Sequence, residues 1–259
     1  MNDYTFESLA RREDDNHWFF AQRKFILKDL MQSFIFPDVS TFRILDIGCG
    51  TGGTTRELSG YGKVTGLEPN PKAVSLIRKR FSDLEIVQGG TSELTDLFAG
   101  TSFDLVTIFN VLYHSEATDP QTVLEDAFRL MKPGGWMLWT EPAYPILKRK
   151  MDRLVHCKRR FHPEEMRAII TSAGFRIRFR TDLMGWLFPA ALVLACINNF
   201  SSVSSPADSN ENKEESLDQK KLPIVINNFL YNISKIEWKI SRNIPLKVGT
   251  SHLLLAQKI

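Results

Sequence analysis

A glycine-rich turn directly after a short apolar segment constrains this chain more than any other feature. The apolar segment covers residues 44–47 and contains Asp46, and Gly48, Gly50 and Gly52 then follow at every second position. Glycine has no Cβ, so the backbone can turn tightly there and bring its amide hydrogens against a bound ligand. The pattern predicts a buried strand that ends at a ligand-binding crevice.

The glycines alone fit more than one ligand class. Gly48, Gly50 and Gly53 also satisfy the G-x-G-x-x-G spacing of dinucleotide-binding proteins, with Glu68 about twenty residues further on. Taken alone this spacing is a weak signal, because a glycine-rich turn in an unrelated α/β protein can match it. A nicotinamide-dependent oxidoreductase therefore stays open at this point.

The chain resembles the class I S-adenosylmethionine (SAM) dependent methyltransferases in three places. Asp46 stands immediately before the loop, Gly52 extends it, and a Lys-Pro-Gly-Gly motif follows at residues 132–135. These features favour SAM over a dinucleotide, and the resemblance covers residues 43–181 and 248–259. It implies a Rossmann-like, seven-stranded, mostly parallel sheet with an antiparallel last strand and helices on both faces.

Alternating apolar runs and helical patterns from residue 43 onward predict a mostly parallel sheet with helices on both faces. The expected strands cover residues 44–47, 64–67, 84–87, 103–109, 136–140, 175–181 and 251–257. We expect four parts: an N-terminal helical cap (1–40), a SAM-binding core (41–182), an inserted helical lid (183–247) with a mobile loop at about 201–221, and the last core strand (248–259).

The composition is that of an ordinary globular protein and excludes several function classes. Hydrophobic residues make up 43%, and the net charge of +3 provides no strong field for nucleic acid. Cys49, Cys157 and Cys196 show no C-x-x-C spacing, which predicts a reducing compartment and no metal site. Residues 1–16 are too polar and acidic for a signal peptide. We therefore expect a cytoplasmic protein without a nucleic-acid partner.

The resemblance implies a SAM site on the loops that follow the first four strands. In the family, Asp46 and the glycine loop would hold the methionyl part of the cofactor. Glu68, at the end of the second strand, would accept both ribose hydroxyls. The full set of expected cofactor residues is Asp46, Gly48, Cys49, Gly50, Gly52, Glu68, Pro69, Gly90, Thr91, Asn110 and Val111.

The chain departs from the family pattern after the third strand. The family usually carries an Asp there that contacts the adenine amino group, whereas this chain has Gly90. Backbone groups, Thr91 or Ser92 would have to replace the carboxylate, although Thr91 and Ser92 are equally good helix N-caps. The departure leaves a SAM-binding or regulatory protein without catalysis as the alternative to an enzyme.

Four residues near the ends of strands four and five are candidate catalytic residues: Tyr113, His114, Glu141 and Tyr144. His114 stands where many small-molecule methyltransferases carry a histidine near the transferred methyl group. Its ordinary pKa near 6.5 would let it deprotonate a hydroxyl nucleophile at neutral pH. The alternative is a histidine that only hydrogen-bonds the loop. Glu141 and Tyr144 follow the fifth strand, where residues often line the acceptor pocket.

Short motifs outside the core resemble one bacterial branch of the family. His17-Trp18-Phe19-Phe20 with Arg23, then Arg159-Arg160-Phe161, then Gly249-Thr250-Ser251 are the counterparts of that branch's motifs. The substrates of that branch are diverse, and the resemblance implies a sugar, a lipid-linked compound or a secondary metabolite as the acceptor. We expect the methyl group to be transferred to oxygen. The sequence leaves the oligomeric state open.

Residues 183–200 contain no charged side chain and allow three interpretations. They could form a buried lid helix, contact a membrane surface peripherally, or span a membrane. A span requires about twenty predominantly apolar residues. Gly185, Pro189 and the pair Asn198-Asn199 weaken that interpretation.

Overall fold

The chain folds around one seven-stranded sheet. A computed structural model describes residues 3–36, 38, 40–114, 119–148, 152, 157–201 and 222–259 of the 259. The strand order is β3-β2-β1-β4-β5-β7-β6, and β7 runs antiparallel to both β5 and β6, whereas the other pairs are parallel. The predicted Rossmann-like architecture is therefore confirmed, including the position of the last strand between the fifth and sixth.

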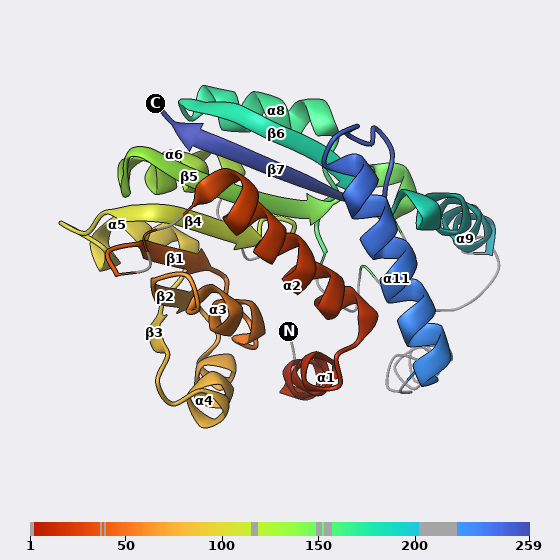
Figure 1. The fold of residues 1–259 in the computed structure, drawn as a ribbon, viewed down its shortest axis with the longest axis horizontal. Helices are drawn as coiled ribbons and strands as arrows, with labels where there is room; N and C mark the ends of the chain where they lie inside the picture. The colour runs from red at the N-terminus through yellow and green to blue at the C-terminus, as the bar shows by residue number, and fades with distance from the viewer. Residues whose placement is uncertain are drawn as a thin grey trace.

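The strands are β1 (Arg43–Ile47), β2 (Lys63–Glu68), β3 (Glu85–Gln88), β4 (Phe103–Phe109), β5 (Met131–Pro142), β6 (Phe175–Leu183) and β7 (Ser251–Lys258). The helices are α1 (Asp3–Asp14), α2 (Trp18–Leu30), α3 (Gly53–Leu58), α4 (Pro71–Arg80), α5 (Leu94–Leu97), α6 (Pro120–Arg129), α8 (Pro163–Ser172), α9 (Phe188–Ser201) and α11 (Ile224–Ser241), and Figure 1 shows their arrangement. A π-helical turn, Met31–Ile35, continues α2 to Phe36, whose left-handed backbone ends it.

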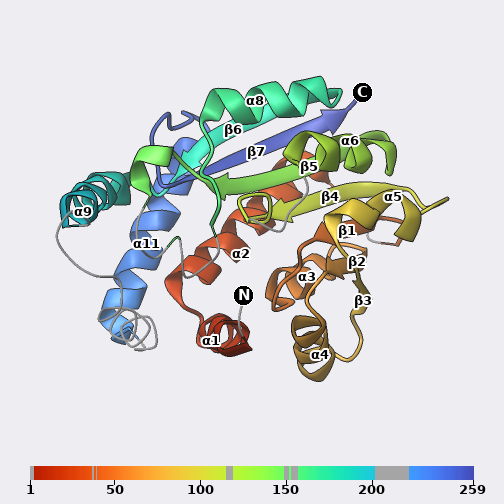
Figure 2. The same cartoon turned by 180° about the vertical axis from the view of Figure 1, so that it is seen from behind.

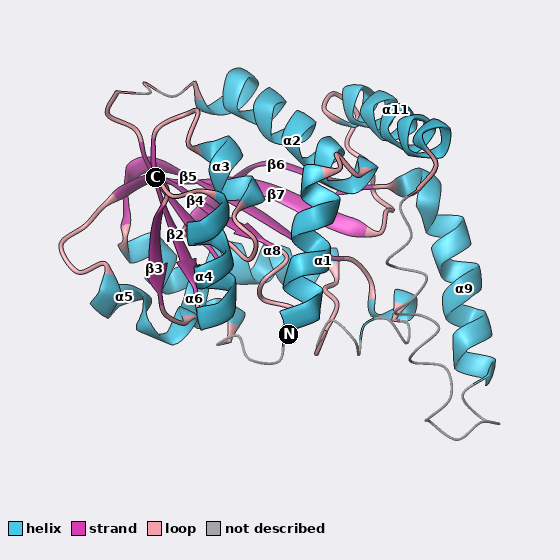
Figure 3. Cartoon of the chain, turned by 90° about the horizontal axis from the view of Figure 1, so that it is seen from below, coloured by secondary structure: helices cyan, strands magenta, loops and turns pink. Residues whose placement is uncertain are grey.

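Helices cover both faces of the sheet (Figures 2 and 3). On one face, α5, α6 and α8 pack against Val106 and Trp139 of the central strands. On the other face, α2, α3 and α11 cover Ile44 and Leu105 of the same strands. Strands β1 and β4 are buried from both sides, which explains why their sequences are almost continuously apolar.

Asn70 caps the start of α4. The Asn70 side chain accepts hydrogen bonds from the backbone N–H of Lys72 at 2.9 Å and of Ala73 at 3.4 Å. Pro71 occupies the first turn, where no intrahelical partner for its nitrogen is needed. The cap fixes the start of α4 directly after the end of β2.

The C-terminal half was expected to contain an apolar segment at 183–200 and a mobile loop at about 201–221. Among the described residues, no helix has both the length and the apolar character needed to cross a membrane. The expected mobile loop at about 201–221 lies outside the described residues except for Ser201, at the end of α9. The division of the chain into four parts stays a prediction.

Candidate functional site

The glycine loop joins the end of β1 to the start of α3. Gly48, Gly50 and Gly52 have φ angles of 70°, 59° and 81°, in the left-handed region that side chains other than glycine rarely adopt. A Cβ at Gly48 would lie 2.5 Å from the Val111 side chain. The Gly48 N–H donates to the Leu67 carbonyl at 2.8 Å, which ties the loop to β2. The loop therefore needs glycine for both its conformation and its packing.

Asp46 lies buried beneath this loop. Its two carboxylate oxygens accept hydrogen bonds from the hydroxyls of Thr55 and Thr107, both at 2.7 Å. Loss of water on burial raises the pKa of Asp46 to about 6, although both hydrogen bonds oppose the shift. The side chain connects β1 to α3 and β4 and so supports the loop from below. Its contact with a cofactor stays a prediction.

Glu68 ends β2 beside the glycine loop and has the features of a ribose acceptor. One carboxylate oxygen accepts from the Gly50 N–H at 2.9 Å and the other from the Asn70 N–H at 3.0 Å. Burial raises the pKa of this carboxyl. Each oxygen has a second lone pair that could accept a hydroxyl hydrogen. The positive-φ loop and this carboxylate together fit the polar part of SAM.

Cys49 and Pro69, the neighbours of these groups, differ in their exposure to solvent. Cys49 is buried in a small cluster with Val74, Ile77 and Ile86, and burial raises the pKa of its thiol. Pro69 is exposed. Their expected contacts with a cofactor would therefore come from the backbone of Cys49 and the ring surface of Pro69, and both stay predictions.

The turn after β3 is built without an aspartate at its second residue. The Gly90 N–H donates to a carboxylate oxygen of Glu93 at 2.7 Å, and Thr91 begins the short helical turn Thr91–Glu93. Glu93 thereby holds the turn closed. Contacts of Gly90 and Thr91 with an adenine stay predictions.

Asn110 and Val111 connect β4 to the residues beside the glycine loop. Asn110 has a φ of 55°, and its N–H donates to the Thr140 carbonyl at 2.9 Å. Within the described residues, its buried Oδ1 atom has no hydrogen-bond partner. A non-glycine residue in this backbone region with an unsatisfied buried oxygen is typical of a ligand site.

Glu141 holds the same loop from β5. One carboxylate oxygen accepts from the N–H groups of Val111 at 3.3 Å and Leu112 at 2.8 Å, and from the Trp139 indole at 3.0 Å. Glu141 is 0% exposed, and loss of water raises the pKa of its carboxyl to about 7. This geometry favours a positioning function for Glu141, and its catalytic function stays a prediction.

Tyr113 and His114 stack on one another at the end of this loop. Their ring centroids are 4.0 Å apart, and the His114 N–H donates to the Val111 carbonyl at 3.1 Å. The His114 backbone also pairs with Cys157. Burial raises the pKa of the Tyr113 hydroxyl. Both rings are partly exposed beside the loop that Asn110 begins, and a base function for His114 stays a prediction.

Tyr144 belongs to a separate polar network. Its hydroxyl oxygen lies 2.7 Å from Oδ2 of Asp182 and 2.7 Å from the Lys247 carbonyl. Oδ1 of Asp182 lies 2.6 Å from Nδ1 of His252, whose Nε2 lies 3.0 Å from the Phe161 carbonyl. The structure therefore ties Tyr144 to β6 and β7, and we find no hydrogen bond from it to the glycine loop among the described residues.

An apolar pocket between α2 and the sheet adjoins Asn110. Its polar groups include two amide side chains, Gln22 and Asn110, each with a buried oxygen that lacks a partner within the described part of the chain. The remaining lining comes from Phe19, Arg23, Ile26, Leu27, Leu30, Phe109, Leu138, Thr140, Leu183, Met184, Ser251 and Leu253. We did not expect Gln22 from the sequence, because one polar residue on an amphipathic helix carries no signal.

Arg23 lies at the edge of this pocket and links it to the glycine loop. Its guanidinium lies over the rings of Phe19, Phe20 and Phe109, at 5.2, 5.7 and 5.5 Å from their centroids. It donates to the Thr54 hydroxyl at 3.3 Å, and burial lowers its pKa. Arg23 was not among the expected site residues, although its place in the N-terminal motif was a signal.

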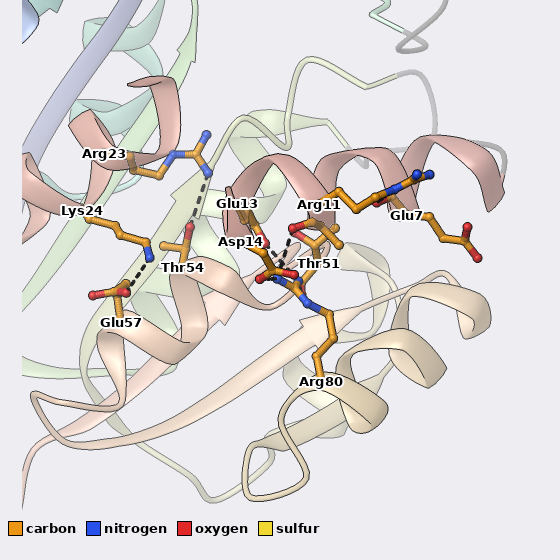
Figure 4. Close-up of polar contacts among 11 residues, drawn as sticks. Glu7, Arg11, Glu13, Asp14, Arg23, Lys24, Thr51, Thr54, Glu57 and Arg80 are labelled. Carbon is orange, nitrogen blue, oxygen red and sulfur yellow. Dashed lines mark hydrogen bonds and ion pairs between the residues drawn. The ribbon is translucent and has the colours of Figure 1, made fainter. Parts of the chain in front are cut away.

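Helix α1 lies over the glycine loop and is fastened there by Arg80 of α4 (Figure 4). The Arg80 guanidinium contacts the carboxylates of Glu13 at 3.0 Å and Asp14 at 2.7 Å, and it donates to the Thr51 carbonyl within the loop. A Cβ at Gly53 would lie 2.5 Å from the Glu13 carboxylate. One cation thus connects the loop, α4 and α1.

Comparisons with known proteins agree with this geometry. Residues 45–139 match the model of a family described as a methyltransferase domain. A demethylmenaquinone methyltransferase of Oceanobacillus iheyensis is 32% identical over 155 residues, which are 56% of this chain and 63% of that protein. A fatty-acid O-methyltransferase of Mycolicibacterium smegmatis is 33% identical over 116 residues, 42% of this chain and 41% of that protein.

A solved structure extends the likeness to the whole fold. The SAM-dependent methyltransferase of Mesorhizobium loti superposes with a TM-score of 0.55 and 16% sequence identity, over 94% of this chain and 99% of that one. The chain spans about half the length of the curated relatives it matches. The family match confirms the expected class of domain and SAM as its cofactor.

Proposed function

We propose that this chain, whose central domain belongs to the class I SAM-dependent methyltransferases, transfers a methyl group to an oxygen of a small, largely apolar acceptor. The relatives that bear on the methylated atom are an O-methyltransferase of ubiquinone biosynthesis and a fatty-acid O-methyltransferase. The name of the demethylmenaquinone methyltransferase supports an apolar acceptor and does not specify the atom. Bound SAM supplies the methyl group on a positively charged sulfur. The protein's own groups then have to bind, orient and desolvate the two reactants.

The residues that would hold SAM are those around the glycine loop. The loop from Gly48 to Gly52 would border the cofactor at the carboxyl ends of the strands. Glu68, which two backbone N–H groups hold in place, would offer its remaining lone pairs to the ribose. Asn110 and Val111, which follow β4, would lie beside the cofactor. Asp46 and Glu141 fix these elements from below.

The observation that supports the acceptor class best is the pair of unpartnered amide oxygens in one apolar pocket. Gln22 and Asn110 both line the pocket between α2 and the sheet. A buried acceptor without a partner costs about 1–3 kcal/mol. A bound molecule with hydroxyl groups on an otherwise apolar body would satisfy both oxygens and fill the space beside them.

Arg23 favours oxygen over nitrogen as the atom that is methylated. Its buried guanidinium has five N–H donors, and we find one hydrogen bond for it in the described residues, to Thr54. A cation at this place stabilises the negative charge of an oxygen that is losing its proton, whereas it disfavours the positive charge that a nitrogen gains when it accepts a methyl group. The acceptor would therefore enter as an enol, a phenol or a carboxylic acid.

The test combines labelled SAM with a panel of apolar phenols, enols, fatty acids, lipid-linked sugars and amines. We expect methylated oxygen products and S-adenosylhomocysteine from the first groups, identified by mass spectrometry. Gln22→Leu should raise the KM of the acceptor and leave SAM affinity unchanged, whereas the control Gln257→Leu, at the far end of β7, should change neither. SAM binding without turnover of any compound would instead favour a non-catalytic SAM-binding protein, and methylated amines alone would contradict oxygen.

A further inference from the structure

Helix α11 is amphipathic, but its apolar stripe faces away from the protein. Val225, Phe229, Ile236 and Ile240 lie on one side of the helix and are 75%, 63%, 59% and 54% exposed. The buried side carries Asn227, Ser234, Trp238 and Ser241. A surface helix of a globular protein normally buries its apolar stripe. The orientation of α11 is therefore the reverse of the usual one.

Hydrogen bonds from the inner side of α11 fix this reversed orientation. The Asn227 amide oxygen accepts from the Trp18 N–H at 2.8 Å, at the start of α2. The Trp238 indole donates to Asp29 at 3.0 Å. Farther along, the Glu237 carboxylate accepts from the N–H of Met184 at 2.6 Å. The inner side of α11 is thus committed to α2 and to the end of β6, so the outward apolar stripe is a fixed feature of the surface.

Helix α9 presents a second apolar surface at the same end of the molecule, as Figures 1 and 3 show. Its buried side consists of Ala191 and Ala195, while Val193, Leu194 and Ile197 are at least 50% exposed. Contiguous exposed apolar residues on neighbouring helices mark an interaction site rather than ordinary surface variation.

The charges around the stripe indicate the kind of partner. Lys235, Lys239 and Arg242 follow one flank of α11. Lys235 lies over the Phe25 ring at 5.1 Å and Arg242 pairs with Asp29 at 2.7 Å, whereas the Lys239 side chain is exposed. The acid within α11, Glu237, is engaged with backbone N–H groups. A second copy of the helix would therefore offer apolar residues and cations but no available carboxylate, whereas an anionic lipid surface complements both.

The segment that connects α9 to α11 has too few apolar residues to cover the exposed stripe. Residues 202–221 join α9 to α11 and consist mainly of Ser, Asn, Asp, Glu and Lys, with Val203 and Leu217 as their large aliphatic residues. Such a composition provides too little apolar area to cover two helical faces.

We propose that α11, together with α9, docks on the surface of an anionic membrane. The helix lies parallel to that surface, its apolar stripe enters the acyl boundary, and the cationic flank contacts lipid phosphates. This surface is separate from the residues of the glycine loop and the pocket, so the inference does not depend on methyl transfer. It extends the membrane contact considered for residues 183–200 to α11.

The test is flotation of the full chain with vesicles of phosphatidylcholine containing phosphatidylglycerol, and with phosphatidylcholine alone. We expect tighter binding to the anionic vesicles. Phe229→Ser with Ile236→Ser should lower the partition coefficient by roughly tenfold per side chain. Lys239→Gln should lower it by about fivefold on anionic vesicles only. The matched control is Ile259→Ser, a residue that is 73% exposed at the opposite end of the sheet.

All four side chains are exposed, so circular dichroism and SAM affinity should be unchanged in every variant. Absence of binding to anionic vesicles would overturn the proposal. Equal loss of binding in Ile259→Ser would overturn it as well, because the contact would then not be specific to α11. A dimer in solution that the double variant dissociates, without vesicle binding, would assign the stripe to a second copy instead.

Discussion

Three buried carboxylates near the strand ends, those of Asp46, Glu68 and Glu141, serve different purposes at the scale of single residues. Asp46 and Glu141 satisfy hydroxyl, backbone or indole donors of the protein itself. Glu68 is held by two backbone N–H groups that belong to the site. Only Glu68 therefore combines a fixed orientation with a position beside the glycine loop, and substitution should separate these functions.

We predict that Glu68→Ala weakens SAM binding by about 1.5–3 kcal/mol, the cost of losing hydrogen bonds to a charged group. Isothermal titration calorimetry measures the change. The control is Glu85→Ala on β3, whose carboxylate pairs with Lys63 at 3.1 Å on the surface. A dissociation constant that Glu68→Ala leaves unchanged would mean that the ribose is held by other groups.

The proposed base function of His114 can be tested by enzyme kinetics. If it is a general base, His114→Ala lowers turnover by about 10²–10⁴-fold and leaves SAM affinity intact. Turnover should also rise with pH through the range of a histidine in the unmodified protein and lose that dependence in the variant. A combined loss of SAM affinity and stability would instead assign His114 to the loop structure.

Glu141 should make the stability of the protein depend on pH. Its pKa is raised from 4.5 to about 7 in the folded state, so the folded protein keeps a proton that the unfolded chain loses. This stabilisation is complete below about pH 4.5 and is lost as the pH rises through 7, a change of about 3 kcal/mol. We predict that Glu141→Gln flattens this dependence. Unfolding in urea between pH 4.5 and 7.5 measures it, and parallel curves for both proteins would contradict the assignment.

At the scale of elements, local sequence signals were sufficient for the helix and strand positions but not for their orientation. Asn70-Pro71 marked the start of α4, and the apolar run at 251–257 identified β7. The periodicity around Phe229 and Ile236 identified α11 as a helix, yet periodicity cannot tell whether a stripe faces inward. That orientation is set by Asn227 and its bond to Trp18, which is 209 residues away.

The site was predictable to the same extent. The glycine loop and Glu68 lie within one strand-turn-helix unit, so their sequence spacing reports their geometry. The pocket is lined by side chains of α2 and of strands far away in the sequence, and Arg80 contacts α1 from α4. Such long-range contacts leave no local sequence pattern. The sequence predicted Glu141 at the correct end of β5. The orientation of its side chain toward the loop is set by hydrogen bonds from Trp139 and Leu112, which the sequence does not reveal.

The fastening of α1 can be tested through Arg80. We predict that Arg80→Ala releases α1 from the glycine loop, because Glu13, Asp14 and the Thr51 carbonyl lose their shared partner. Hydrogen exchange in α1 should rise, and SAM should bind roughly tenfold more weakly if α1 orders the loop. Arg78→Ala, an exposed position on the same helix, is the control. Unchanged exchange in α1 would show that Arg80 does not hold it.

At the scale of the whole molecule, the network of Asp182 and His252 joins β6, β7 and the segment after β5. Both ring nitrogens of His252 lie within hydrogen-bond distance of oxygen atoms, Nδ1 beside Asp182 and Nε2 beside the Phe161 carbonyl, so Asp182 and His252 form a buried polar pair. Removing one member of such a pair is far more costly than breaking a surface pair.

We predict that Asp182→Asn lowers the free energy of unfolding by about 3–5 kcal/mol. The control Asp83→Asn, which removes the exposed carboxylate beside Arg56, should lower the free energy of unfolding far less, because solvent screens that contact. Chemical denaturation of both variants provides the comparison. Equal losses would show that the buried pair contributes no more than a surface contact.

The place of β7 also determines the order in which the molecule can assemble on the ribosome. Among the strands that the structure describes, β6 lies at the edge of the sheet and pairs with β7 alone, and β7 is made about seventy residues later. While a nascent chain grows, the outer side of β5 therefore remains an open edge, and α2 lacks both α11 and part of the floor of the pocket beneath it. Strands β1 to β5 can pair during synthesis, whereas the pocket between α2 and the sheet closes only after translation has reached Leu253.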